Sequence, residues 1–480
     1  MLTGRVNAPE INTKYGWLNT NGKSYSINDF KGKIVLLDFW TLGCINCQHI
    51  IPDLQRLEAE FPEELVVIGV HSAKFDNEKV HNAIRKAILK FGIKHPVVND
   101  AGFEVWKHYA VNAWPTIVLI DPDGKVIGQR AGEGIYDIVK PNLALLIENF
   151  KNKLNRTIFS FQAEEQLPGI LQFPSKLLVN VAGEIYLSDS GHHRILKINQ
   201  DGKILQIIGS GDRGFTNGAS HEATFNEPHG LALHSNYLYV ADAKNNAIRK
   251  VDVETGWVTT VAGTGELSYY FFEDSLNEPV NPNSPWDLAV ANDILYIASA
   301  GNHQILKMDL NTEQVWRFAG TGREALADGS LLEAAFNQPS GLVLQNQMLY
   351  VADAEASAIR VIDLDNKQVN TLIGTGLFDF GDVDDDLNGA QLQHAMGITY
   401  YQNQLYIADT YNGKIKAVDL ENDRITTLLA GLDEPNDVEI IAGKLWVTDT
   451  NHHQLIKVDL TTGEKFLVSV TENMDIFKKD

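Results

Sequence analysis

The segment Ile34-Val-Leu-Leu-Asp-Phe-Trp-Thr-Leu-Gly-Cys-Ile-Asn-Cys47 contains both cysteines of this 480-residue chain. Its first half, Ile34–Trp40, is a β-branched and aromatic run of the kind that forms a buried strand. Apolar residues then recur at helical spacing, namely Ile50, Ile51, Leu54, Leu57 and Phe61. Cys44 is therefore expected where a buried strand turns into a helix, and there the backbone N–H groups and the helix dipole favour a thiolate over a thiol.

Strand-like and helix-like patterns alternate around this segment up to about residue 150. The predicted strands are Ile34–Trp40, Leu65–Val70, Pro96–Val98, Thr116–Ile120 and Lys125–Gln129. The predicted helices are Cys47–Phe61, Glu78–Phe91, Phe103–Tyr109 and Tyr136–Lys151. The turn sequence Asp121-Pro-Asp-Gly124 joins the last two strands into a hairpin. Together these patterns predict an α/β layered domain over residues 1–152.

The rest of the chain repeats a short pattern six times, apolar-Tyr/Trp-apolar-small-Asp/Ser. The copies are Ile185–Asp189, Leu238–Asp242, Leu295–Ser299, Leu349–Asp353, Leu405–Asp409 and Leu445–Asp449. Each copy lies among other short strand-like runs, and four strands per unit at this spacing are typical of a β-propeller blade. We therefore expect an all-β, six-bladed propeller over residues 153–480, with Thr157–Phe161 adding a strand to the last blade to close the ring.

The residues after each copy carry a further signature. Asn302-His303-Gln-Ile305 and Asn451-His452-His-Gln-Leu455 follow the fifth position of their copies, and Gly191-His192-His193-Arg-Ile195 is a close variant. These segments resemble NHL repeats, which are named for an Asn-His-Leu consensus. The resemblance extends over about residues 165–470 and implies the propeller fold.

Composition and charge narrow the functional classes. Residues 1–150 hold 16 Lys and Arg against 17 Asp and Glu, whereas residues 151–480 hold 24 against 45. An acidic second half repels nucleic acid phosphates and anionic membrane surfaces, so we expect neither as a partner. No apolar run is long enough to span a membrane, and the first residues lack the apolar core of a signal peptide.

The spacing of the two thiols indicates redox chemistry. In Cys-x-x-Cys, the second thiol can reach a mixed disulfide on the first and release the reduced substrate. Asp38 lies before the motif, Pro52 lies after Cys47, and Trp114-Pro115-Thr116 comes just before a predicted strand. This combination resembles thioredoxin-like proteins.

The thioredoxin resemblance implies roles for several residues. Cys44 would attack, Cys47 would resolve and a buried Asp38 would relay a proton. Pro115 would be a cis-proline that, with the Trp114 backbone, pairs with an extended substrate. Trp40 and Thr116 complete the predicted substrate-binding residues. The order of the two domains, and the Cys-Ile-Asn-Cys motif, resemble the NHL-repeat-containing protein 2 family over essentially the whole chain.

Each of these features also has a second interpretation. Gly43 stands where thioredoxins usually have Trp, and Ile45-Asn46 replaces their Gly-Pro, so the fold could have lost its redox chemistry. His49 or His71 could join the thiols in a zinc site, although a second ligand cluster is absent from the sequence. Pro115 could be an ordinary trans turn proline, and Asp38 merely a buried carboxylate.

The propeller offers its own alternatives. The strand-ending acids Asp189, Asp242, Asp353, Asp409 and Asp449, with Ser299, could form a ring at the channel mouth or cap backbone N–H groups between blades, and we favour the caps. Asp384-Asp-Asp386-Leu-Asn388-Gly389 partly matches a calcium loop, but its twelfth position is Ala395. Ala327-Asp-Gly329 and Thr216-Asn-Gly218 occupy the same place in other blades, which indicates a blade-connecting turn.

The sequence thus predicts a thiol-disulfide oxidoreductase of the disulfide reductase type, whose propeller docks a protein partner. It needs no cofactor beyond the redox-active Cys44–Cys47 disulfide and no metal. Because no other cysteines exist for structural disulfides, we expect a cytoplasmic protein, with a mature chain from an oxidising compartment as the alternative. The competing hypotheses are a redox-inactive interaction scaffold and a propeller hydrolase with a channel metal.

Overall fold

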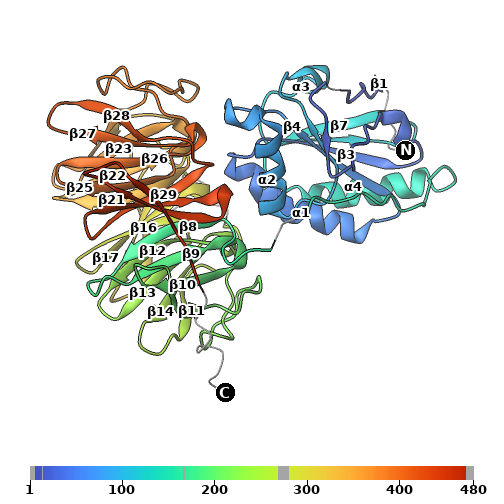
Figure 1. Ribbon diagram of the computed structural model, residues 1–480. Coiled ribbons are helices and arrows are strands. Elements are labelled where there is room, and N and C mark those ends of the chain that lie inside the picture. The colour runs from blue at the N-terminus through green and yellow to red at the C-terminus, as the bar shows by residue number, and fades with distance from the viewer. Residues whose placement is uncertain (1–5, 13, 166–167, 269–279, 472–480) are drawn as a thin grey trace. The chain divides into compact units, whose positions relative to one another are not determined.

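Two units make up the chain in the computed structural model, Met1–Leu167 and Pro168–Asp480 (Figure 1). The structure describes residues 6–12, 14–165, 168–268 and 280–471. Among these residues, no helix is long and apolar enough to cross a membrane.

The first unit is built on a seven-stranded mixed sheet in the order β1-β7-β6-β3-β4-β5-β2. Its strands are β1 (Val6–Asn7), β2 (Trp17–Leu18), β3 (Ile34–Trp40), β4 (Leu65–His71), β5 (Val97–Asn99), β6 (Thr116–Ile120) and β7 (Lys125–Ala131). Its helices are α1 (Ile45–Glu60), α2 (His81–Phe91), α3 (Glu104–His108) and α4 (Tyr136–Asn149), with short 3₁₀ turns η1 (Ile27–Phe30) and η2 (Asn77–Lys79). Strands β3, β4 and β5 run parallel, and β6 pairs antiparallel with β3. The predicted α/β architecture is confirmed.

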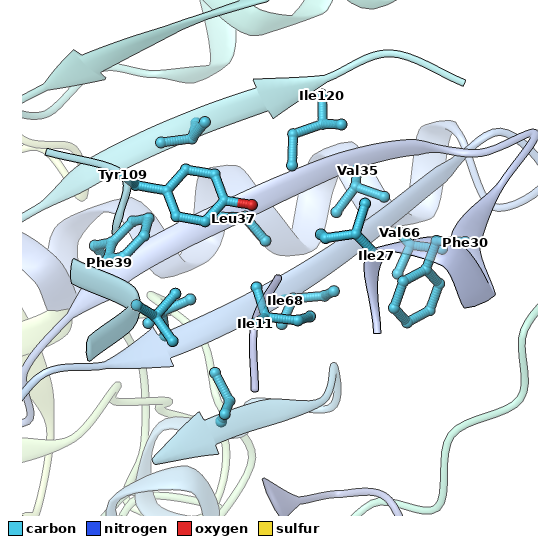
Figure 2. Packing of buried hydrophobic residues seen from close by; sticks show 14 of the residues in the cluster. Ile11, Ile27, Phe30, Val35, Leu37, Phe39, Val66, Ile68, Tyr109 and Ile120 are labelled. Carbon is cyan, nitrogen blue, oxygen red and sulfur yellow. The ribbon is translucent and has the colours of Figure 1, made fainter. Parts of the chain in front are cut away.

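The alternation of side chains along β3 divides the apolar core of this unit in two. Val35, Leu37 and Phe39 face a cluster that includes Val66, Ile68 and Tyr109, and Figure 2 shows these side chains converging on one face of the sheet. Ile34 and Leu36 face the opposite way and pack with apolar residues of α1 and α4. Asp38 and Trp40 follow in register on this second face, so they lie on the α1 side of the sheet.

The segment after α4 belongs to the first unit, and the prediction for it is wrong. Thr157–Phe161 forms no strand; instead Phe159 and Phe161 pack on the first-unit core, where Phe159 contacts Phe30 and Phe161 contacts Tyr25. We expected the domains to meet at residues 152 and 153, whereas the compact units divide between Leu167 and Pro168. The apolar character of Phe159 and Phe161 indicates that they are buried, but it does not show whether they join the core of the first unit or that of the propeller.

The described residues of the second unit form six antiparallel sheets, five with four strands and one with five, each made of consecutive strands (Figure 1). The blades are β8 (Pro174–Val179), β9 (Ile185–Asp189), β10 (Arg194–Ile198) and β11 (Ile204–Ile208); β12 (Pro228–His234), β13 (Tyr237–Asp242), β14 (Ala247–Asp252) and β15 (Val258–Ala262); β16 (Pro285–Ala291), β17 (Ile294–Ser299), β18 (Gln304–Asp309) and β19 (Gln314–Ala319); β21 (Pro339–Gln345), β22 (Met348–Asp353), β23 (Ala358–Asp363) and β24 (Gln368–Ile373); β25 (Gly397–Tyr401), β26 (Gln404–Asp409), β27 (Lys414–Asp419) and β28 (Arg424–Leu429); and β29 (Pro435–Ile441), β30 (Lys444–Asp449), β31 (Gln454–Asp459) and β32 (Lys465–Val468). The fourth blade carries an extra short strand, β20 (Gly329–Ser330). Six blades were predicted, and six are observed.

At four blade junctions, neighbouring blades are joined by a hydrogen bond at the turn after the second strand. There a residue in the left-handed conformation accepts a backbone N–H that lies just before the first strand of the next blade. The pairs are His193 Nδ1 with Glu227 N (3.1 Å), Asn246 Oδ1 with Ser284 N (2.8 Å), Ser357 Oγ with His394 N (3.0 Å) and His453 Nδ1 with Phe173 N (3.0 Å). The last pair links the sixth blade to the first and helps to close the ring.

This arrangement predicts a pH dependence of stability through His193. Desolvation by burial lowers the pKa of this imidazole, and protonation of Nδ1 would in addition remove the acceptor of the Glu227 N–H. The unfolded state therefore takes up a proton more readily, and stability is lost as the pH falls below about 6.5, the ordinary histidine value. His193→Asn keeps an acceptor, as Asn246 does in the next blade, and should reduce the loss of Tm between pH 7 and pH 5. An unchanged pH dependence of Tm, measured by thermal unfolding, would contradict this role.

Candidate functional site

The two cysteines lie together at the start of α1, where the sequence placed them. Cys44 is the N-cap residue of α1, and its sulfur accepts the backbone N–H of Cys47 at 3.2 Å. The two sulfur atoms are 2.7 Å apart and are not joined in a disulfide. Cys44 is partly exposed, whereas Cys47 is 1% exposed. An incoming disulfide can thus reach Cys44 before Cys47.

The environment of Cys47 favours its protonated form. Burial raises the pKa of this thiol well above its usual value, and the hydrogen bond to Cys44 and the nearby Asp38 carboxyl act in the same direction. A buried thiol of this kind becomes a nucleophile only when a base removes its proton.

Asp38 supplies an ionisable group on the same side of the sheet. It is 2% exposed, and burial raises the pKa of its carboxyl to about 7. Its Oδ1 atom has no hydrogen-bond partner among the described residues. A carboxyl with a pKa near 7 can both accept and release a proton at neutral pH.

The predicted proline is in place. The Trp114–Pro115 peptide bond is cis, as the thioredoxin resemblance implied, and Pro115 directly precedes β6. The Trp114 indole donates to the Ser72 carbonyl at 3.0 Å and packs on Trp106 with ring centroids 4.6 Å apart. Trp114 is half-buried, so part of its surface is available beside the proline.

Two of the predicted substrate-binding side chains are fully enclosed. Trp40 is 1% exposed and packs edge-on against His71, and Thr116 is 3% exposed and donates its hydroxyl to the Ala113 carbonyl at 2.7 Å. Their burial argues against direct contact with a substrate. Strand alternation places Trp40 inward, and the sequence could not distinguish an inward aromatic residue from a surface one.

Glu78 is a site residue that sequence reasoning missed. Its side chain is 0% exposed, and its carboxylate accepts the Gly43 N–H at 2.8 Å and the Thr41 hydroxyl. It also accepts the N–H groups of Lys74 (2.7 Å) and Phe75 (3.0 Å). Glu78 therefore fixes the loop immediately before Cys44 to the segment after β4. The sequence indicated only that Glu78 begins a predicted helix, and no local pattern connects it with the cysteine motif.

The histidines considered as zinc ligands have other contacts. His49 Nδ1 lies 2.5 Å from Glu133 Oε1, and His71 is buried with its pKa lowered to about 3 by desolvation. Within the described residues, no group of three or more His, Cys, Asp and Glu side chains is placed to hold a metal ion.

The strand-ending acids of the propeller are structural caps. All six side chains are 0% exposed, and each accepts a backbone N–H just before the first strand of its own blade. The pairs are Gln172 N–Asp189, Asn226 N–Asp242, Asn283 N–Ser299, Asn337 N–Asp353, Gln393 N–Asp409 and Asp433 N–Asp449, at 2.7 to 3.1 Å. The capping interpretation is confirmed, except that the caps lie within blades rather than between them, and a ring of acids at the channel mouth is excluded.

A lysine crosses the propeller axis. The first strands of successive blades pack around the ring, and Lys176 on β8 projects from the first of them. Its ammonium lies 2.9 Å from Asp287 Oδ2 and 3.4 Å from Asp437 Oδ1, in the third and sixth blades, and donates to the Met396 carbonyl at 3.3 Å. This cation already compensates the acids at the centre, so they are poorly suited to bind a metal ion.

The partial calcium loop is one of three equivalent turns. Asp384 Oδ1 accepts from Lys416 Nζ (2.8 Å) and Thr427 Oγ1 (3.1 Å). Asn217 is bonded in the same way to Arg249 and Thr260, and Asp328 to Arg360 and Thr371. The turn interpretation accounts for these residues.

Comparisons with known proteins agree with both units. A family model described as thioredoxin-like matches residues 32–126. NHL repeat-containing protein 2 from Gallus gallus is 38% identical over 95% of this chain and 70% of its own length. Protein SUPPRESSOR OF QUENCHING 1, chloroplastic, from Arabidopsis thaliana is 38% identical over 95% of this chain and 47% of its own length. Thiol-disulfide oxidoreductase ResA from Bacillus cereus is 37% identical over 23% of this chain and 62% of its own length.

Asp38→Asn should stabilise the protein at alkaline pH. The folded-state pKa of about 7 lies above the unfolded value of 3.8, so stability falls as the pH rises from about 4 through 7. Removing the carboxyl should raise the free energy of unfolding at pH 8 by about 2–4 kcal/mol, with little change near pH 4. Denaturant unfolding at the two pH values measures this difference, and an equal effect at both would show that Asp38 is not a titrating buried acid.

Glu78→Ala should disorder the Cys44 loop, because four donors lose one buried acceptor. We expect a loss of about 2–4 kcal/mol in unfolding free energy and faster alkylation of Cys47 by iodoacetamide. Glu78→Gln retains one acceptor oxygen and should give a smaller loss. If the Ala variant shielded Cys47 as well as the native chain does, Glu78 would not position this loop.

Proposed function

This chain belongs to the NHL repeat-containing protein 2 family, and we propose that it is a thiol-disulfide oxidoreductase of the disulfide reductase type that acts on a protein partner. One observation carries the proposal: a partly exposed thiol at a helix start, Cys44, has a buried thiol and a buried carboxyl with a pKa of about 7 behind it. The match to a protein named as a thiol-disulfide oxidoreductase supports the same chemistry.

The first step is an attack by the Cys44 thiolate on one sulfur of the substrate disulfide. The substrate S–S bond breaks as the bond to Cys44 forms, and the released substrate thiolate takes a proton from solvent. The Cys47 N–H, 3.2 Å from the Cys44 sulfur, and the α1 dipole stabilise the attacking thiolate.

The second step resolves the mixed disulfide. Cys47 gives its proton to the Asp38 carboxylate and attacks the Cys44 sulfur, and the second substrate sulfur leaves as a thiolate that is then protonated. Two electrons have passed to the substrate, and Cys44 and Cys47 are joined in a disulfide that a thiol reductant must reduce for another cycle. Within the chain, the dithiol is the redox group that carries out this reaction, and the external thiol reductant regenerates it.

Substrate orientation is assigned to the segment before β6. The Trp114 backbone and Pro115 flank the start of that strand, and the half-buried Trp114 ring stacks with Trp106. An extended substrate segment lying along this backbone would place its disulfide against Cys44. The buried side chains of Trp40 and Thr116 would support this segment from the protein interior and would not contact the substrate.

The propeller is proposed to dock the partner protein, because residues 151–480 hold 24 Lys and Arg against 45 Asp and Glu and would favour a basic partner. Since only two cysteines occur in the chain, we propose a reducing compartment, with the cytoplasm as the first candidate. A scaffold without redox activity is the second candidate. The match to the NHL repeat protein over 95% of the chain, propeller included, favours it as the alternative.

Cys47→Ser should trap the first step. With the resolving thiol gone, Cys44 remains in a mixed disulfide, so covalent adducts that dithiothreitol releases should accumulate on the full chain. Mass spectrometry of these adducts names the partner. Cys44→Ser/Cys47→Ser is the matched control and should form none.

Turnover gives the second readout. Native protein with dithiothreitol should reduce a model protein disulfide, and Cys44→Ser should lower kcat/KM to the rate of dithiothreitol alone. Equal turnover in the two proteins, together with no adduct on Cys47→Ser, would favour the scaffold.

A further inference from the structure

Four polar side chains are buried together beneath the dithiol, on the α1 side of β3 and β4. They are Asp38, Trp40, His71 and His95, and none is more than 3% exposed. Asp38 Oδ1, Trp40 Nε1 and His95 Nε2 have no hydrogen-bond partner among the described residues. Buried polar atoms in folded proteins almost always have a protein or water partner, so three such atoms in one place call for a ligand of their own.

Gly69 lies close to two of these atoms. It lies opposite Asp38 in the register of β3 and β4. A Cβ atom at this position would lie 2.9 Å from Trp40 Nε1 and 3.6 Å from His95 Nε2. The same Cβ would lie 3.0 Å from Val97 Cγ2, so the absence of a side chain at Gly69 is what lets the indole donor and the imidazole acceptor lie this close to β4, next to Asp38.

His95 connects this space to the outside of the unit. Its Nδ1 lies 3.2 Å from Glu58 Oε2 on α1, and the Glu58 side chain is 29% exposed. A carboxylate at that distance fixes the tautomer with the proton on Nδ1, which leaves Nε2 as an acceptor facing inward. The imidazole thus has one nitrogen toward Asp38 and the other toward a solvent-accessible acid.

We propose that Asp38, His95 and Glu58 form the proton path between Cys47 and solvent, with one buried water joining Asp38 Oδ1, Trp40 Nε1 and His95 Nε2. The path rests on the proposed function, for which Cys47 must lose a proton. The Cys47 proton passes to Asp38 and then, through the water, to His95 Nε2. His95 releases its Nδ1 proton to Glu58, and Glu58 releases it to solvent, which leaves the imidazole with its proton on Nε2. When a thiol reductant reduces the disulfide and Cys47 regains a proton, a proton passes inward along the same groups and the imidazole returns to its first tautomer.

The other ionisable groups near Asp38 do not compete for this role. Cys44 and Cys47 on α1 are the reacting thiols, and His71 on β4 is held neutral, since burial lowers its pKa to about 3. The His71 ring packs edge-on to Trp40 at 4.8 Å between centroids, on the sheet side of the cluster. His95 faces Asp38 from the segment before β5, and when its ring is protonated its positive charge acts to lower the pKa of the Asp38 carboxyl.

The test separates the two thiol steps. Reaction of the reduced full chain with dithiobis(nitrobenzoate) releases one coloured thiolate when Cys44 attacks and a second when Cys47 resolves the adduct. Stopped-flow absorbance from pH 6 to 8 gives both rates. In Glu58→Gln, which keeps an acceptor for Nδ1 but cannot carry the proton, the ratio of the second rate to the first should fall about tenfold. The matched control is Glu60→Gln, on the same helix and 32% exposed, which should keep the native ratio.

A second measurement does not depend on thiol reactivity. Carbon NMR of the Asp38 carboxyl should show its pKa rising in His95→Gln, because the protonated form of His95, whose positive charge favours the ionised carboxylate, can no longer form. An unchanged rate ratio in Glu58→Gln, or an unchanged Asp38 pKa in His95→Gln, would overturn the path. A native protein without the first coloured phase would contradict the oxidoreductase proposal instead, and the NMR titration would still decide whether His95 is coupled to Asp38.

Discussion

A buried polar group needs a hydrogen-bond partner. The capping side chains of the propeller have one within the protein, whereas three buried polar atoms beneath the dithiol have none in the part of the chain that the structure describes. In the propeller, each strand-ending Asp or Ser is completely buried and is bonded to a backbone N–H of its own blade. These contacts cap the strand ends and keep the acids out of contact with solvent. Under the dithiol, Asp38, Trp40 and His95 are also buried, but Asp38 Oδ1, Trp40 Nε1 and His95 Nε2 have no hydrogen-bond partner among the described residues. A folded protein tolerates such a cluster at a cost in stability, and functional sites are where that cost is commonly found.

The sequence was most informative where one short segment carried both structure and chemistry. The Ile34–Cys47 segment predicted β3, the start of α1 and the relation of the two thiols, because strand alternation, helical spacing and Cys-x-x-Cys are local patterns. Glu78 and His95 could not be found in this way. Each reaches the site from a part of the chain remote from the cysteines, and only the paired strands bring them there. Likewise, Phe159 and Phe161 could be recognised as core residues but not assigned to a core.

The repeats show how one position can be filled by different residues without loss of its structural role. Arg249 and Arg360 extend from equivalent strands to a loop of the same blade, and Lys416 does so in the fifth blade. The partner in that loop is Asn217, Asp328 or Asp384. The partial calcium motif of the fifth blade reflects the same preference for a side-chain oxygen in this loop. That oxygen, Asp384 Oδ1, accepts a hydrogen bond from Lys416. Repeat position was therefore a better guide to these residues than motif matching.

Lys176 has a consequence for how this propeller could change its blade number. One side chain of fixed length ties the first blade to the third and the sixth across the axis. Duplication of a blade would widen the ring and carry Asp287 and Asp437 beyond the reach of the ammonium group, which would strand three buried charges. Deletion of a blade would crowd them instead. The two ion pairs of Lys176 therefore suit a ring of six blades, and a ring with another number of blades would need different residues at its centre.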